Sequence, residues 1–193
     1  NISEEELTET LKGFTDIRTE GKRKNFDYTE YNDGIYVGYR YYTTQNIPTS
    51  FPFGFGLSYT SFKYSNPIVT KDAKGNIKVC VEIKNTGKRA GKEVVQVYVS
   101  APGKDMDKPA SELKGFTKTK KLNPSESEAV EITIPYESLA SFNEENSSWQ
   151  VEGGTYSVMI AQNAADMNPL TTTINEEGRV TETVRPCLLP EQK

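Results

Sequence analysis

Apolar and polar side chains alternate with a period of two along several short stretches from about residue 66 onward. Stretches 77–83, 94–99, 129–134 and 154–160 each place their branched or aromatic side chains on one face, and turn residues separate them. This alternation is typical of strands that turn one face toward a core. The predicted inward-facing residues are Val79, Val81, Ile83, Val95, Val97, Val99, Val130, Ile132, Ile134, Tyr156, Val158 and Ile160. Six or seven such strands predict an all-β fold, a two-sheet β-sandwich over residues 66–193 with a C-terminal tail.

Two parts of the chain lack this alternation. Residues 136–149 predict one turn of helix followed by a loop. Residues 1–65 predict a long, mostly irregular segment rich in aromatic side chains. Of the 20 aromatic residues in the chain, 13 lie between Phe26 and Tyr64, and the stretch SFPFGFGLSYTSF (50–62) holds five of them. At about 150–250 Å² for each ring, this segment carries more apolar surface than a monomer normally exposes.

Three hypotheses explain the aromatic segment. Its rings could form a strap between the sandwich and another domain, a small core within the domain itself, or a platform that stacks against sugars. The glycines, which permit tight bends, and Pro48 and Pro52, which favour extended neighbours, favour the strap. The residues predicted to pack between domains are Tyr36, Tyr39, Arg40, Tyr41, Phe51, Phe53, Phe55 and Tyr59.

Composition and charge exclude several function classes. The net charge of −4 gives no basic patch for nucleic acid or an anionic membrane surface, and no apolar run approaches the roughly 20 residues of a membrane helix. The chain has no histidine, which excludes His-dependent nucleophilic catalysis and the usual zinc sites. Cys80 and Cys187 match no metal spacing; two free thiols are the simpler interpretation, and a disulfide stays open. The sequence therefore predicts no catalytic residue, no substrate-binding residue, no metal ligand and no cofactor.

Four stretches, in order, resemble one known family. They are NDGIYVGYRYY (32–42), FPFGFGLSYTSFKYSN (51–66), VEIKNTGKRAGKEVVQVYVSAPG (81–103) and ELKGFTKTKKLNPSES (112–127). Together with SWQVEGGTYSVMIAQN (148–163), they resemble the C-terminal region of glycoside hydrolase family 3 β-glucosidases and β-xylosidases. The resemblance covers residues 30–162, and Phe55 stands where many members have histidine.

The resemblance implies a retaining parent enzyme with a barrel domain that carries an Asp nucleophile and a second domain that supplies a Glu acid/base. Both carboxylates belong to motifs upstream of those present in this sequence. Residues 1–65 would then be the linker from the catalytic domains, and residues 66–193 a fibronectin type III-like sandwich. Since residue 1 is Asn, we interpret the chain as processed or as a fragment.

The implied partners are the catalytic domains of the parent, in the same or a separate chain, and the implied substrate is an oligo- or aryl β-glycoside. The resemblance also implies a periplasmic or secreted parent. Two alternatives stay open: a stand-alone carbohydrate-binding or adhesive module, and a structural spacer. Trp149 is the single tryptophan of the chain, which gives thin support to a carbohydrate module.

Overall fold

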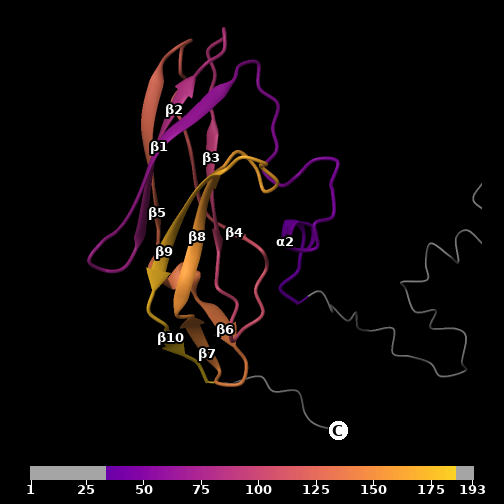
Figure 1. The fold of residues 1–193 in the computed structure, drawn as a ribbon, viewed down its shortest axis with the longest axis vertical. Helices are drawn as coiled ribbons and strands as arrows, with labels where there is room; N and C mark the ends of the chain where they lie inside the picture. The colour runs from indigo at the N-terminus through magenta and orange to yellow at the C-terminus, as the bar shows by residue number, and fades with distance from the viewer. Residues whose placement is uncertain (1–33, 186–193) are drawn as a thin grey trace, which may run out of the picture. The chain divides into compact units, whose positions relative to one another are not determined.

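The structure is a computed structural model that describes residues 34–185. The chain divides into two units, Asn1–Gly34 and Ile35–Lys193, and the fold described below lies within the second. Its centre is a pair of antiparallel sheets that face each other (Figure 1). One sheet has the order β1-β2-β5, with bounds Phe62–Lys71, Ile77–Asn85 and Ser127–Ile134. The other has the order β4-β3-β8-β9, with bounds Glu112–Lys118, Val94–Ser100, Gly154–Ala161 and Leu170–Glu176.

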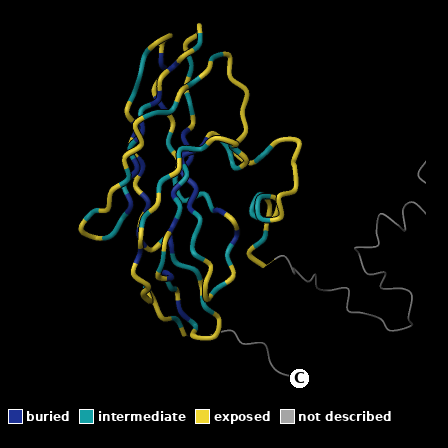
Figure 2. Tube along the Cα trace, viewed as in Figure 1, coloured by how far each residue is buried: buried dark blue, intermediate teal, exposed yellow. Residues whose placement is uncertain are grey.

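The core lies between these two sheets, where alternate side chains of each strand meet. All twelve residues predicted to face inward are buried in one cluster, which confirms the period-two pattern of the sequence. Ile77, Leu122, Tyr136, Leu139 and Val151 complete the cluster. Figure 2 shows the buried positions running along the strands of the sandwich. The all-β prediction is therefore confirmed.

A third, smaller sheet extends one end of the sandwich (Figure 1). Its order is β10-β7-β6, with bounds Arg179–Thr183, Ser148–Val151 and Ser141–Asn143. The single helical turn predicted after residue 136 is present as the 3₁₀ helix η1, Tyr136–Leu139. The prediction of a loop after this helix is wrong, because residues 141–151 form the hairpin of β6 and β7.

Tyr156 occupies a position typical of immunoglobulin-like sandwiches. It lies near the start of β8, is almost fully buried, and donates a hydrogen bond of 2.9 Å from its hydroxyl to the backbone oxygen of Glu152. This arrangement is a tyrosine corner. Burial raises the pKa of the Tyr156 hydroxyl to about 12. The Tyr156 hydroxyl therefore keeps its proton, and can donate this hydrogen bond, at neutral pH.

The aromatic segment differs from the irregular linker of the prediction at two places. Residues Tyr39–Thr44 form a short helix, α2, which begins after Gly38 at φ 61°. Strand β1 begins at Phe62, so the predicted start of the sandwich at residue 66 falls inside this strand. Its irregularity between Ser65 and Ile68 surrounds Pro67, which an edge strand tolerates at a bulge. Within residues 34–185, no helix is long and apolar enough to cross a membrane.

Candidate functional site

Helix α2 and its flank are joined to the connection between β3 and β4 and to the start of β4. Three hydrogen bonds make this junction: Tyr36 Oη to Asp107 Oδ1 at 2.5 Å, the Ala110 amide to Thr44 Oγ1 at 2.9 Å, and the Leu113 amide to Tyr39 Oη at 2.8 Å. An ion pair of 3.1 Å between Arg40 and Glu112 lies beside them. The hydrogen bond to Asp107 raises the pKa of Tyr36 above its ordinary value. The aromatic segment is thus attached to its own sandwich at its upstream end.

The connection that receives α2 is itself held by a buried carboxylate. Glu152 Oε1 accepts hydrogen bonds from the backbone amides of Asp105 at 2.7 Å and Met106 at 2.9 Å. Its second oxygen lies 3.8 Å from Lys108 Nζ, and both side chains are nearly inaccessible. Burial lowers the pKa of Lys108. These contacts fix the surface on which α2 lies.

Two rings of the aromatic segment pack on the outer face of β3. Tyr39 stacks on Phe53 with ring centroids 4.7 Å apart and meets the edge of Tyr98 at 6.1 Å. Tyr98 points away from the main core, yet it is buried because this segment covers it. Burial raises the pKa of its hydroxyl, which donates to Gln96 Oε1 at 2.7 Å. Part of the aromatic segment therefore forms a small core within the domain.

Other side chains of the segment remain in solvent. We call Phe51, Phe55, Leu57 and Tyr59 the aromatic surface. Leu57 and Tyr59 are each 93% exposed and Phe51 is 72% exposed, and Phe51 and Phe55 contact each other with centroids 5.2 Å apart. Figure 2 shows the loop that carries these residues as largely exposed. A free monomer seldom leaves so many large apolar side chains uncovered together.

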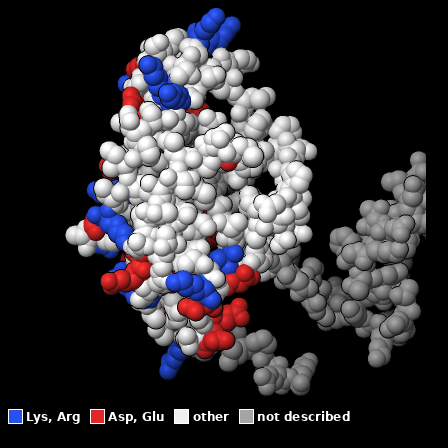
Figure 3. All heavy atoms as spheres, in the orientation of Figure 1, with Lys and Arg blue, Asp and Glu red and all other residues white. Residues whose placement is uncertain are grey.

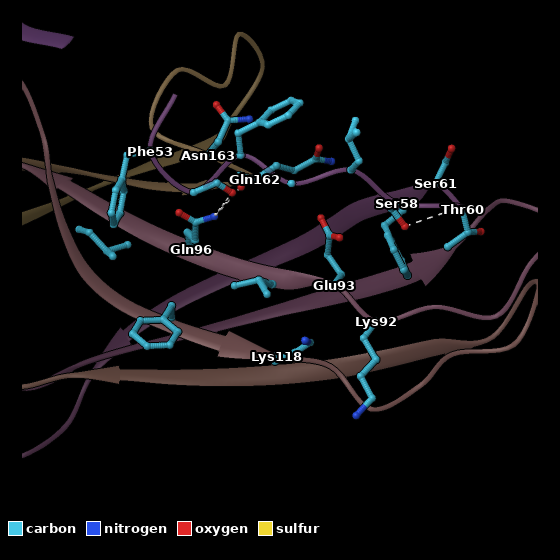
Figure 4. Close-up of a pocket in the computed structure, with 18 residues that line it drawn as sticks. Phe53, Ser58, Thr60, Ser61, Lys92, Glu93, Gln96, Lys118, Gln162 and Asn163 are labelled. Atoms are coloured by element: carbon cyan, nitrogen blue, oxygen red, sulfur yellow. Dashed lines mark hydrogen bonds between the residues drawn. The ribbon is translucent and has the colours of Figure 1, made fainter. Parts of the chain in front are cut away.

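Two hollows flank the aromatic surface and share Phe53. One, of about 730 Å³, is lined by residues 53–58 together with Leu113 and Phe116 of β4 and the polar side chains shown in Figure 4. The other, of about 700 Å³, lies between α2, residues 46–53 and residues 164–167. Glu93, which lines the first hollow, accepts a hydrogen bond of 2.9 Å from the Tyr64 hydroxyl, and burial raises the pKa of Glu93. Both hollows offer neighbouring space for side chains of a partner.

The aromatic surface lies in a stretch without charge. Residues 41–62 contain no Asp, Glu, Lys or Arg, although these make up 26% of the whole chain. In Figure 3 the part of the surface that belongs to this stretch is white, while charged side chains lie at the two ends of the sandwich and along its opposite edge. A partner surface that fits this stretch would be neutral and apolar.

Comparison with known proteins shows which protein family this chain is similar to. Residues 93–164 match the fibronectin type III-like domain family. The chain is 43% identical over 162 residues to thermostable β-glucosidase B of Acetivibrio thermocellus, which covers 82% of this chain and 21% of the relative. The structure of β-glucosidase 3B from Thermotoga neapolitana in complex with glucose is 47% identical, with a TM-score of 0.73 over 78% of this chain and 21% of that chain.

A third similar protein is a family 3 (GH3) enzyme. The structure of the Bifidobacterium adolescentis GH3 β-glucosidase is 31% identical, with a TM-score of 0.73 over 88% of this chain and 25% of that chain. This chain belongs to the C-terminal, fibronectin type III-like region of the family 3 glycoside hydrolases. It spans about a fifth of the length of the curated relatives that it matches. In those relatives, the region is part of a longer chain.

The predicted packing residues of this family 3 region divide into two groups. Tyr36, Tyr39 and Arg40 are half-buried and contact their own sandwich, Tyr36 at the β3–β4 connection and the other two at the start of β4. The others are exposed to at least two fifths of their surface: Tyr41, Phe51, Phe53, Phe55 and Tyr59. Packing between domains stays a prediction for all eight. The upstream aromatics Phe26, Tyr28 and Tyr31 lie outside the described residues.

Sequence reasoning missed the residues that hold the aromatic segment in place. Gln96 and Asn85 are buried amides, and Phe116 is an exposed ring beside the first hollow. The available signal was Tyr98, a large ring on the outward face of a central strand, which indicates that another segment covers it.

Cys80 is a free thiol on β2, while Cys187 lies outside the described residues. Within residues 34–185, no group of His, Cys, Asp or Glu could hold a metal ion.

Proposed function

We propose that this region docks through its aromatic surface onto the catalytic domains of a family 3 glycoside hydrolase and stabilises them. The parent is a retaining enzyme of the β-glucosidase type, periplasmic or secreted, that hydrolyses oligo- or aryl β-glycosides. One observation carries the proposal. Leu57 and Tyr59 are almost fully exposed on an uncharged stretch, although the chain on both sides of them is attached to the sandwich.

The role of the surface follows from its chemistry. Apolar area removed from water stabilises a contact by about 25 cal/mol per Å², and the centre of an interface is depleted of charge. The aromatic surface meets both conditions. Its polar neighbours, among them Glu93 and Lys118, lie on the sandwich side of the first hollow. They would form the rim of such an interface.

A chimera tests this function. This chain replaces the matching region of Thermotoga neapolitana β-glucosidase 3B, and the double variant Leu57→Ser with Tyr59→Ser removes the two most exposed side chains. We expect the variant chimera to lose thermal stability and to lose glucosidase activity faster on heating. The same double variant in the chain alone should unfold at nearly the wild-type temperature, because these side chains contribute little to the core of the sandwich.

A matched control uses exposed apolar residues outside the aromatic surface. Ile68 on β1 and Val180 on β10 are both more than half exposed. Replacing both with Ser should leave the chimera unchanged. A Leu57→Ser, Tyr59→Ser chimera as stable as its parent would refute docking through this surface. Loss of oligosaccharide binding with unchanged stability would instead favour direct contact with sugar.

A further inference from the structure

We propose that two buried amide side chains, Gln96 and Asn85, hold the loop of residues 55–59 in its docking shape before a partner arrives. The proposal rests on the docking function above and identifies what positions that surface. The loop carries three of the four side chains of the aromatic surface, and its two ends are fixed by different parts of the sandwich. Gln96 and Asn85 are therefore positioning residues.

Gln96 fixes the upstream end of the loop. Its side chain is 4% exposed, and Nε2 donates to the backbone oxygens of Gly54 at 3.2 Å and Gln162 at 2.5 Å. Both N–H groups of the amide are thus used as donors, and Oε1 accepts a hydrogen bond from the Tyr98 hydroxyl. A backbone bond of 2.9 Å from the amide of Ala164 to the oxygen of Phe53 reinforces the attachment. Figure 4 shows Gln96 pointing toward Gln162 and the chain that follows Phe53.

Gly54 is required for this upstream attachment. Its φ of +81° lies in the region that favours glycine. A Cβ at this position would lie 2.1 Å from Gln96 Oε1 and 2.5 Å from Nε2, so no side chain fits without displacing the amide. Gly56, two residues later, has an ordinary φ and nothing within 4 Å of its Cβ position. The two glycines of the FGFG sequence therefore differ in role, and only the first depends on the sandwich.

Asn85 fixes the downstream end of the loop. Its side chain is fully buried, and Oδ1 accepts from Thr60 Oγ1 at 2.6 Å and from the amide of Gly87 at 3.0 Å. Nδ2 donates to the backbone oxygens of Arg89 at 2.8 Å and Leu122 at 2.9 Å. All four hydrogen-bonding positions of the amide are occupied, which offsets the cost of burying it.

The glycines of the following turn close this downstream contact. A Cβ on Gly87 would lie 2.2 Å from Thr60 Oγ1, and one on Gly91 would lie 2.7 Å from Thr60 Cγ2. The next residue is held as well, because the amide of Thr86 donates to the backbone oxygen of Ser61 at 2.8 Å. Thr60 is thus enclosed on three sides. We call the contact of Gln96 with Gly54 and the contact of Asn85 with Thr60 the two clamps of the loop. Removing the Thr60 hydroxyl therefore tests the downstream clamp.

A loop fixed at both ends favours docking because less conformational entropy is lost on binding. Between the clamps, the loop makes short local contacts only, such as the hydrogen bond of 3.3 Å from the Thr60 amide to Ser58 Oγ in Figure 4. Its side chains are free to enter an apolar recess of the partner. The partner that fits is a neutral, apolar protein surface, which the catalytic domains of a longer chain would present.

Two matched pairs of variants test the clamps in the isolated chain. Gly54→Ala is compared with Gly56→Ala, and Thr60→Val, which loses the hydroxyl, with Thr60→Ser, which keeps it. Chymotrypsin reports on the loop because Phe55, Leu57 and Tyr59 are cleavage sites. We expect Gly54→Ala and Thr60→Val to raise the cleavage rate about tenfold, the shift in opening that the loss of buried hydrogen bonds of this kind gives. Gly56→Ala and Thr60→Ser should be cleaved at the wild-type rate.

The same clamp variants in the chimera report on docking. We expect Gly54→Ala and Thr60→Val to shorten the half-life of glucosidase activity at elevated temperature, with an unchanged KM before inactivation, and Thr60→Ser to restore it. Equal cleavage rates for all four variants would overturn the clamps. Faster cleavage without any loss of half-life would overturn their role in docking. If the Leu57→Ser, Tyr59→Ser chimera is unaffected, the proposed function fails, and the cleavage rates still decide whether the clamps exist.

Discussion

Replacement of Val97 by Ala should destabilise the sandwich through an inner strand of its four-stranded sheet. Val97 is 0% exposed on β3, opposite Gly115 of β4 and Ile160 of β8. The change removes two methyl groups, each contributing about 0.8 kcal/mol of transfer free energy. The cavity that remains adds to this, because neighbours on two strands cannot all move inward. We expect the free energy of unfolding to fall by about 2–3 kcal/mol.

Urea unfolding followed by far-UV circular dichroism measures this change, and the dependence on urea should keep its slope. A loss of this size lowers the melting temperature of a domain of this length by roughly 5–10 °C. Val94→Ala is the matched control, since Val94 lies on the same strand and is 37% exposed. It should cost less than about 0.5 kcal/mol. Equal losses for the two variants would contradict the assigned inward face of β3.

Three further predictions concern other parts of the chain. Tyr156→Phe should lower the free energy of unfolding by about 1–2 kcal/mol, since it removes the donor to Glu152; an unchanged urea midpoint would refute a stabilising tyrosine corner. Burial raises the pKa of Glu93 above 4.5, so the folded state binds a proton more readily than the unfolded chain, and stability should fall as pH rises from about 4.5 through the folded pKa. Glu93→Gln should remove this part of the pH dependence in urea titrations, and an identical slope for both proteins would contradict it. The chain alone should hydrolyse no aryl β-glycoside; turnover by a sample free of other polypeptides would refute this.

The sequence predicted the two-sheet core because burial there depends on a local pattern. Strands such as 77–85 keep strict alternation over their full length, so each inward side chain follows from its neighbours. The sheet of β6, β7 and β10 escaped the same analysis. Two of its strands have three and four residues, too short to show a period. The third, Arg179–Thr183, is mostly polar and reaches β7 from a distant part of the chain.

The positioning residues of the candidate site could not be predicted, because their burial depends on segments remote in the sequence. Gln96 occupies an outward position of β3 and would be exposed if residues 53–54 did not cover it. Helix α2 forms from YRYYTT, in which the Tyr and Thr residues have modest helix propensity and tertiary contacts to residues 110–113 compensate. The number of aromatic residues alone indicated that some rings of the segment must be buried, but it did not indicate which ones.

The hypothesis of an internal core holds for one part of the aromatic segment, and the strap stays a prediction for another part. Tyr39 and Phe53 cover Tyr98, so removing them would expose β3 and weaken this domain whether or not a partner is bound. Leu57 and Tyr59 cover nothing in their own sandwich at 93% exposure. The two ends of their loop are nevertheless held by the buried, hydrogen-bonded amides of Gln96 and Asn85. Buried polar groups with complete partners rigidify the backbone around them. This contrast within about 20 residues separates the side chains that stabilise this domain from those that we propose to dock.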